Sequence, residues 1–181
     1  MTSKSIYFAF LHLVVVALAV QVVVLGKQNR EMKQRQNPIQ TERLKAGDTL
    51  AFSGLQSVRP GYVPDTLPLK RVVFVLSTKC PFCSESLPLW NRLTSRLSGH
   101  VNVFAVSLDS KDSTISFVNR NDITFPVLVP LNLEGFKKTN RTHAVPLTLL
   151  TSSSGIIEQI WVGGFDEKKL REVSSAALSL K

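Results

Sequence analysis

Cysteine is scarce in this sequence: its 181 residues include only two. Two thiols cannot build a scaffold held by several disulfides, nor a zinc site with four cysteine ligands. Glycine and proline number nine each and no segment repeats, which excludes collagen-like and solenoid proteins. Acidic side chains are also few, 13 against 22 Lys and Arg, for a formal net charge of +9. The length suits one globular domain of ordinary size.

A long apolar run stands near the N-terminus. After a tail of residues 1–5, residues 6–25 contain no Asp, Glu, Lys or Arg. A helix of that length rises about 30 Å, the thickness of a bilayer core. We therefore predict that residues 6–25 form an uncleaved transmembrane anchor. A cleavable signal peptide is the alternative, because Ala17-Leu18-Ala19 has the small-x-small form of a cleavage site.

The residues that follow this run are polar and basic, and we interpret residues 26–45 as a juxtamembrane stalk. Residues 1–45 hold seven Lys and Arg against two Glu, whereas residues 46–181 hold fifteen basic against eleven acidic side chains. Under the positive-inside rule, this charge favours a cytoplasmic location for the C-terminal part. The basic residues are not interleaved with aromatic ones, so we expect no nucleic-acid partner.

Alternating strands and helices are predicted for the rest of the chain. Continuous β-branched and aromatic runs predict buried strands, and apolar residues at helical spacing predict helices. The expected strands are 72–77, 101–108, 146–150 and 156–162, with an extended segment over 124–129 interrupted by Pro126. The expected helices are 84–97, 113–119 and 167–180, with Asp109 and Asp112 as candidate caps of the second. This order predicts an α/β fold, a mixed sheet with helices on both faces.

The two cysteines form the motif Cys80-Pro81-Phe82-Cys83, which lies between the first predicted strand and the first predicted helix. At a helix N-terminus, unpaired backbone N–H groups and the helix dipole favour the thiolate of Cys80. Cys83 lies within one helical turn, close enough to form a disulfide with Cys80. We therefore expect Cys80 to be the nucleophile and Cys83 the more buried resolving thiol. Their disulfide would be the only redox group, with no other cofactor.

Two other roles suit a cysteine pair. A structural zinc site would need two more ligands, yet His100 and His143 are the only histidines outside the apolar run and show no paired spacing. We therefore expect no metal site. The second alternative is a pair of inert buried cysteines, which the order strand–CPFC–helix disfavours.

The segment FVLSTKCPFCSESLPLW resembles the thioredoxin-like superfamily, in particular the membrane-anchored TlpA/ResA-like redoxins (AhpC-TSA type) of bacteria. The resemblance covers residues 46–181 and extends to Lys45-Ala46-Gly47-Asp48, to Pro88 and to Val145-Pro146. It implies a thioredoxin-like fold and a cis-proline at Pro146 that faces the cysteines. In such proteins the backbone of the residue before that proline pairs with a client peptide. The client-binding residues implied are Pro81, Phe82, Val145 and Pro146.

Three positions depart from this family pattern. Phe74 stands where thioredoxins have a buried Asp, Lys79 where an aromatic residue is usual, and Ser86 where TlpA/ResA-like proteins often carry Glu. Glu85, one residue before Ser86, is the candidate for proton transfer at the cysteines. One residue turns a helix by about 100°, so the alternative is that Glu85 is an ordinary surface carboxylate near the helix start.

Together these features predict a membrane-tethered thiol–disulfide oxidoreductase that exchanges disulfides with client proteins, with reduction favoured over oxidation. The reverse cycle, which donates a disulfide, would use the same residues and stays an alternative. A membrane or thioredoxin-type electron donor would reduce it again. The resemblance implies a domain on the outer side of a bacterial inner membrane, against the flanking charges. One alternative is a peroxiredoxin-like peroxide reductase, for which Ser77 matches the family pattern but Val73 replaces its proline. The other is a non-catalytic client-binding module.

Overall fold

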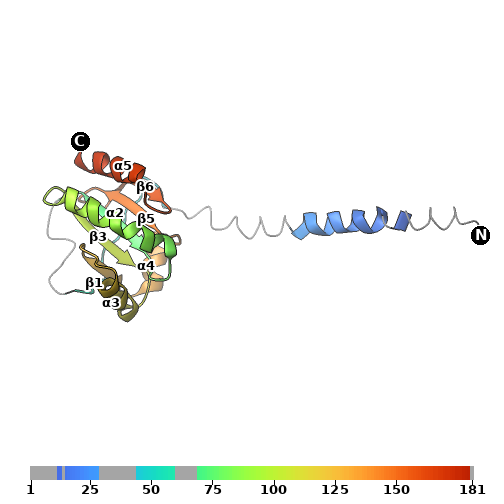
Figure 1. Cartoon of the computed structure of the whole chain (residues 1–181), viewed down its shortest axis with the longest axis horizontal. Helices are drawn as coiled ribbons and strands as arrows, with labels where there is room; N and C mark the ends of the chain where they lie inside the picture. The colour runs from blue at the N-terminus through green and yellow to red at the C-terminus, as the bar shows by residue number, and fades with distance from the viewer. Residues whose placement is uncertain (1–11, 14, 29–43, 60–68, 180–181) are drawn as a thin grey trace, which may run out of the picture. The chain divides into compact units, whose positions relative to one another are not determined.

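The computed structural model describes residues 12–13, 15–28, 44–59 and 69–179 (Figure 1). The chain divides into two units, residues 1–43 and residues 44–181. The second unit holds a six-stranded sheet in the order β1-β4-β3-β2-β5-β6. Its strands are β1 (Leu55–Ser57), β2 (Arg71–Leu76), β3 (Asn102–Ser107), β4 (Val127–Pro130), β5 (Leu147–Thr151) and β6 (Ile157–Val162). Its helices are α2 (Pro81–Leu97), α3 (Lys111–Arg120), α4 (Leu133–Asn140) and α5 (Glu167–Leu178).

The sheet is mixed, as the sequence predicts. β2, β3 and β4 run parallel to one another, whereas β1, β5 and β6 each pair antiparallel with their neighbours. Parallel strands joined through a helix follow a right-handed crossover, which places α2 and α3 on the same face of the sheet. The thioredoxin-like fold that the resemblance implies is therefore confirmed in its mixed central sheet and flanking helices.

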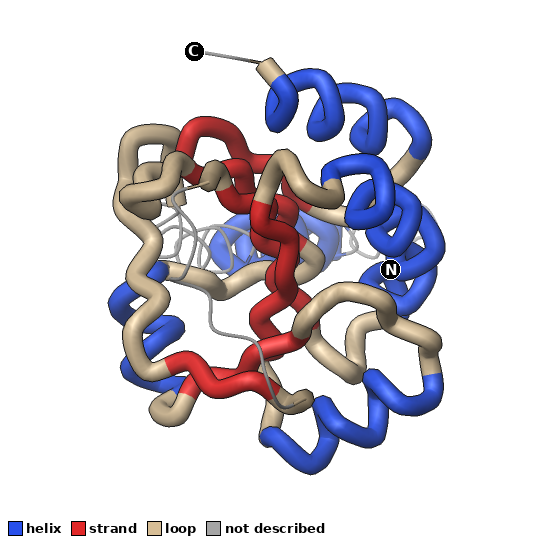
Figure 2. The backbone as a smooth tube through the Cα atoms, turned by 90° about the vertical axis from the view of Figure 1, so that its left-hand side faces the viewer, coloured by secondary structure: helices blue, strands red, loops and turns tan. Residues whose placement is uncertain are grey.

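Helices cover both faces of the sheet (Figure 2). Successive side chains of a strand point to opposite faces, so β2 contributes side chains to two hydrophobic cores, one on each face of the sheet. Phe74 and its alternate neighbours pack against α2, α3 and α5, whereas Val73 and Val75 pack on the opposite face, where Phe136 of α4 joins them. All six residues of β2 are buried, which explains the continuous apolar run that follows Arg71.

The KAGD motif near the start of the second unit pairs with the hairpin between β5 and β6. Gly47 N donates to Ile157 O at 2.8 Å, and Ile157 N donates to Asp48 O at 2.8 Å. Leu50 N donates to Gly155 O at 2.9 Å, where the hairpin turns. Gly155 has φ +87°, and a Cβ there would lie 2.9 Å from Leu50 O, so this close pairing requires glycine.

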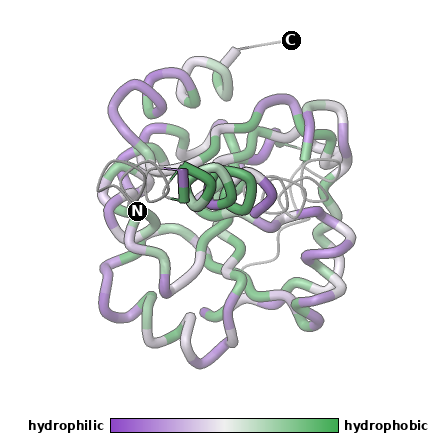
Figure 3. Tube along the Cα trace, turned by 90° about the vertical axis from the view of Figure 1, so that its right-hand side faces the viewer, coloured by the Kyte–Doolittle hydropathy of each residue, from purple (hydrophilic) through white to green (hydrophobic). Residues whose placement is uncertain are grey.

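In the first unit, residues 12–13 and 15–28 are helical and mostly hydrophobic (Figure 3). Their large apolar side chains are 48–70% exposed. Within the described residues, no helix is both long enough and apolar enough to cross a membrane. Residues 6–11 and 14 of the predicted anchor lie outside the described part of the chain, as do residues 1–5 and residues 29–43 of the predicted stalk.

Several element boundaries differ from those predicted. α2 begins at Pro81, three residues before the expected start, because proline suits the first helical turn. Ser110, and not Asp109 or Asp112, caps α3: its Oγ accepts a hydrogen bond from Ser113 N at 3.3 Å. β4 begins only after Pro126, whose ring nitrogen cannot donate to a sheet.

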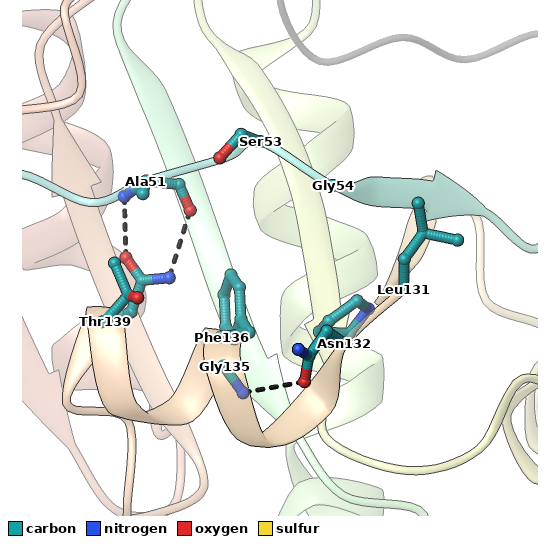
Figure 4. A pocket seen from close by; sticks show the side chains of 10 residues that line it. Ala51, Ser53, Gly54, Leu131, Asn132, Gly135, Phe136 and Thr139 are labelled. Atoms are coloured by element: carbon teal, nitrogen blue, oxygen red, sulfur yellow. Dashed lines mark hydrogen bonds between the residues drawn. The ribbon is translucent and has the colours of Figure 1, made fainter.

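β1 and α4 were not predicted. α4 has only two buried residues, Phe136 and Asn140, so its apolar pattern is weak. Polar contacts hold it instead (Figure 4). Asn132 Oδ1 accepts from Gly135 N at 2.9 Å and caps the helix, while the Asn140 amide accepts from Ala51 N at 2.7 Å and donates to Ala51 O at 3.1 Å. These contacts border a hollow of about 230 Å³ between α4 and the chain before β1.

Candidate functional site

The CPFC motif lies where β2 ends and α2 begins. Three residues, Ser77 to Lys79, turn the chain from the strand into the helix. Cys80 is the N-terminal capping residue of α2, with extended backbone angles, and Pro81 opens the first turn. Cys83 N and Ser84 N both donate to Cys80 O, at 3.1 and 3.3 Å. Cys80 therefore stands at the helix N-terminus that the sequence predicts for it.

The two thiols are both free and differ in burial. Cys80 is partly exposed, whereas Cys83 is completely buried. Burial raises the pKa of the Cys83 thiol to about 12, and the neighbouring Cys80 adds to the rise. A backbone hydrogen bond from Ser77 to Cys83 opposes it only in part. Cys83 is therefore a neutral thiol at physiological pH, and Cys80 is the thiol of the pair that solvent can reach.

An aromatic cluster lies within the core that buries Cys83. Phe74 and Trp90 stack with ring centroids 4.6 Å apart and an interplanar angle of 16°. Phe125 and Phe165 meet Phe74 edge-on at 5.1 and 6.5 Å. Such ring pairs stabilise a core by more than the burial of their apolar surface alone would. Phe74, at the position of the thioredoxin Asp, thus contributes an aromatic ring and not a carboxylate to the core that contains Cys83.

The predicted client-binding residues lie around Cys80. The Val145–Pro146 peptide bond is cis, as the resemblance implies, and Cys80 Sγ lies 4.0 Å from Val145 O. Val145 is half-buried and Pro146 is buried. Phe82, between the cysteines, is 61% exposed, and Pro81 is exposed as well. Near Cys80 the chain thus presents the carbonyl of Val145 and the exposed side chains of Pro81 and Phe82.

Glu85 and Ser86 lie on different faces of α2. Ser86 is buried; its hydroxyl donates to Phe82 O at 2.6 Å and accepts from Phe165 N at 2.9 Å. Glu85 is exposed, and within the described residues it makes no hydrogen bond or ion pair. The helix turns by about 100° between these neighbours, so the inner face that carries Cys83 receives the serine. The structure leaves the glutamate on the outer face.

Asp109, which the sequence suggests as a helix cap, instead contacts the turn that precedes the dithiol. It follows β3, and because β2 and β3 run parallel, their carboxyl ends meet at one edge of the sheet. Asp109 Oδ2 accepts hydrogen bonds from Ser77 Oγ at 2.9 Å and from Thr78 N at 2.6 Å. Its negative charge contributes to the raised pKa of Cys83. The signal available in the sequence was its place directly after a buried strand.

A cleft of about 300 Å³ opens beside the dithiol. It is lined by Ser77, Asp109 and Val145, together with Leu108, Lys137, Thr142 and His143. The side chains around it are mostly polar, and both signs of charge are present. Within the described residues, no group of three or more His, Cys, Asp or Glu could hold a metal ion.

Solved structures with similar folds were found, but no curated protein sequence matches the chain. A thiol-disulfide isomerase from Corynebacterium glutamicum is 21% identical, with a TM-score of 0.64 over 76% of this chain and 100% of that one. The thioredoxin domain of a thiol-disulfide oxidoreductase from Bacteroides vulgatus is 12% identical, with a TM-score of 0.63 over 75% and 99%. A thioredoxin-related protein from Neisseria meningitidis is 21% identical, with a TM-score of 0.57 over 68% and 97%. These likenesses establish the thioredoxin-like fold.

The sequence profile of the AhpC/TSA family matches residues 65–160. This range is more than half of the chain and spans β2 to most of β6. It includes the CPFC motif, Asp109 and the cis-proline, which are the parts that build the candidate site. With a redoxin fold around a strand–CPFC–helix junction, the chain belongs to the AhpC/TSA family.

Proposed function

We propose that this protein is a membrane-tethered thiol–disulfide oxidoreductase that reduces disulfides of client proteins through Cys80 and Cys83. One observation carries the proposal: a partly exposed thiol stands at a helix N-terminus, with a buried thiol one turn deeper. The partly exposed Cys80 can react with the disulfide of another protein, whereas the buried Cys83 can react only with Cys80. Two inert structural cysteines would not need this difference in access.

The reaction proceeds by two exchanges. The Cys80 thiolate attacks one sulfur of a client disulfide, forms a mixed disulfide and releases the other client sulfur as a thiolate. Cys83 then loses its proton and attacks Cys80 Sγ. This step forms the Cys80–Cys83 disulfide and releases the second client sulfur. The client gains two electrons and the enzyme loses two, so an electron donor of the membrane or thioredoxin type must reduce the enzyme again.

The client approaches over Val145, Pro146, Pro81 and Phe82. The position of Val145 O, 4.0 Å from Cys80 Sγ, allows an extended client backbone to pair beside the reacting sulfur. The exposed Phe82 ring supplies an apolar contact next to that pairing. Backbone pairing depends little on the side chains of the client, so this arrangement suits an enzyme that acts on several clients.

The apolar run of residues 6–25 anchors the enzyme, with the dithiol domain outside the cytoplasm. Its exposed Leu and Val side chains support insertion in a bilayer. Disulfide exchange is common outside the cytoplasm, and large domains can cross despite flanking positive charge. A fusion of alkaline phosphatase to the C-terminus tests the orientation in bacteria. Phosphatase activity supports it, and activity only of a cytoplasmic reporter contradicts it.

Insulin reduction with dithiothreitol as electron donor tests the activity. The full-length chain should accelerate the precipitation of reduced insulin, and Cys80→Ala should abolish the acceleration. When reduced Cys83→Ala is mixed with insulin without dithiothreitol, it should instead accumulate a mixed disulfide with insulin, visible on a non-reducing gel and cleared when reductant is added. Equal rates for the wild type and Cys80→Ala would contradict the proposal in favour of a client-binding module. Consumption of hydrogen peroxide without insulin reduction would indicate a peroxide reductase.

A further inference from the structure

We infer that Lys169 is a positioning residue for client binding: it fixes the loop between β6 and α5, and that loop holds Pro146 and the start of α2 in place around the dithiol. The inference rests on the proposed function and deepens it by naming a residue on which client binding depends. Lys169 lies in the first turn of α5, far along the chain from the CPFC motif.

The ammonium group of Lys169 donates to three consecutive backbone carbonyls. Its Nζ lies 2.8 Å from Val162 O, 3.4 Å from Gly163 O and 2.7 Å from Gly164 O. A lysine ammonium has three N–H donors, so the three carbonyls use all of them. Hydrogen bonds from a charged donor are stronger than those between neutral groups. The oxygens of the loop are therefore fixed on the side that faces Lys169.

One peptide unit of the loop connects Lys169 with Pro146. Val162 O and Gly163 N belong to the same trans peptide, so they point in opposite directions. The oxygen accepts from Lys169, and the nitrogen donates to Pro146 O at 2.9 Å. Because Pro146 is one of the proposed client-binding residues, Lys169 helps to set where the client-binding backbone lies.

A second peptide unit connects Lys169 with α2. Gly164 O accepts from Lys169, and the N–H of the same unit, that of Phe165, donates to Ser86 Oγ at 2.9 Å. The Ser86 hydroxyl in turn donates to Phe82 O at 2.6 Å, within the CPFC motif. The loop is thus tied to both sides of the dithiol, to the proline segment before β5 and to the start of α2.

Two glycines make this loop depend on an outside support. Gly163 and Gly164 are consecutive, and Gly163 has φ +82°. Glycine loses more conformational freedom on ordering than any other residue. The loop also leaves β6, which lies at the edge of the sheet. Without the ammonium of Lys169, we expect the glycines to sample other conformations, so that the N–H donors to Pro146 and Ser86 lose their fixed direction.

The neighbouring Lys168 supplies a matched comparison. It is exposed, and its Nζ lies 3.8 Å from a carboxylate oxygen of Glu172 on the same helix. Surface pairs of this kind contribute little to stability. One residue turns a helix by about 100°, which directs Lys169 and not Lys168 to the loop. The two lysines therefore carry the same charge and differ in what they hold.

The experiment measures insulin reduction by the full-length chain in detergent, with dithiothreitol as electron donor and the insulin concentration varied. Lys169→Met should raise the KM for insulin roughly tenfold, the lower end of the cost of losing one hydrogen bond to a charged group. The kcat should stay within about twofold, because the thiols themselves are unchanged. Lys168→Met should leave both constants within about twofold of wild type.

Two further measurements separate positioning from the chemistry of the thiols. The small disulfide 5,5′-dithiobis(2-nitrobenzoic acid) needs no backbone pairing, so the reduced Lys169→Met chain should react with it within about twofold of the wild-type rate. Amide hydrogen exchange reports on the loop itself. The N–H groups of Gly163 and Phe165 should exchange at least about tenfold faster in Lys169→Met and at the wild-type rate in Lys168→Met.

A folded Lys169→Met chain with the wild-type KM would overturn the inference. An equal rise of KM in Lys168→Met would also overturn it, because the cause would then be the charge and not the loop. Slower reaction with both disulfides would do the same, since Lys169 would then act on the thiols or on the whole fold.

If Lys169→Met does not fold, Lys169→Gln decides by the same readout. Its amide keeps two donors but lacks the charge, so KM should still rise at least about threefold. A wild-type KM in Lys169→Gln would overturn the inference. A wild-type chain that reduces no insulin would refute the proposed function itself, so the two failures remain distinct.

Discussion

Burial separates the two thiols at the scale of single residues. Cys83 is enclosed in the core that contains the ring stack of Phe74 and Trp90, while Cys80 is partly exposed at the start of α2. An ionised sulfur is poorly solvated in such a core, so the protonated form of Cys83 is favoured. The same feature that keeps Cys83 from outside reagents therefore also makes its ionisation costly.

This cost predicts a pH-dependent stability of the reduced protein. The pKa of Cys83 rises from 9.0 to about 12 on folding, so between these values the unfolded chain binds fewer protons than the native one. The free energy of unfolding should therefore fall as pH rises from about 9 towards 12. Urea titrations of the reduced chain at a series of pH values measure this fall.

Cys83→Ala is the control for that measurement, because alanine cannot ionise. Its free energy of unfolding should depend less on pH over the same range. Other groups such as lysine and tyrosine titrate there in both proteins, so the difference between the two curves carries the result. Parallel curves would contradict the burial argument.

Single residues were also the hardest to predict from the sequence. The roles expected of Cys80 and Cys83 follow from a helix starting beside a strand, and the structure places both thiols accordingly. The choice between Glu85 and Ser86 for the inner face depends on the rotation of α2, which is set by packing. Asp109 reaches Ser77 and Thr78, just before the dithiol, only because β2 and β3 are parallel neighbours, and that pairing is not visible locally.

At the scale of elements, long apolar patterns were sufficient for β2, α2, β3 and the β5–β6 hairpin. α4 could not be predicted because it is held by hydrogen bonds from Asn140 to the backbone of Ala51, and it lacks the row of apolar residues that marks a helix in a sequence. β1 has only three residues, fewer than alternation needs to be recognised. Elements with large buried faces are thus readable in this sequence, and elements held by a few side-chain hydrogen bonds are not.

Asn140→Ala tests how α4 is held. The buried amide satisfies both backbone groups of Ala51, and its removal leaves a donor and an acceptor without partners. We expect a loss of about 1–3 kcal/mol in the free energy of unfolding, measured by urea titration. Thr139→Ala, an exposed neighbour on the same hollow, should change it by no more than about 0.5 kcal/mol. Equal effects of the two variants would show that the amide is not the anchor.

At the scale of the whole molecule, the two units have separate tasks in this account. The candidate site draws on described residues of the second unit alone, from Ser77 to Val145. Residues 44–181 expressed without the first unit should therefore reduce insulin at a rate within about twofold of the full chain. A twofold change corresponds to only about 0.4 kcal/mol in the activation free energy of the reaction. They should also leave the membrane fraction. Membrane retention of the shortened protein would contradict the anchor.

The most direct test of the account is the alkylation of the two thiols in the native reduced chain, followed by mass spectrometry of the peptides. Iodoacetamide should modify Cys80 rapidly and Cys83 only after unfolding, and mild oxidation should join the two sulfurs and protect both. Similar alkylation rates for the two thiols, or a failure to form the Cys80–Cys83 disulfide, would contradict it.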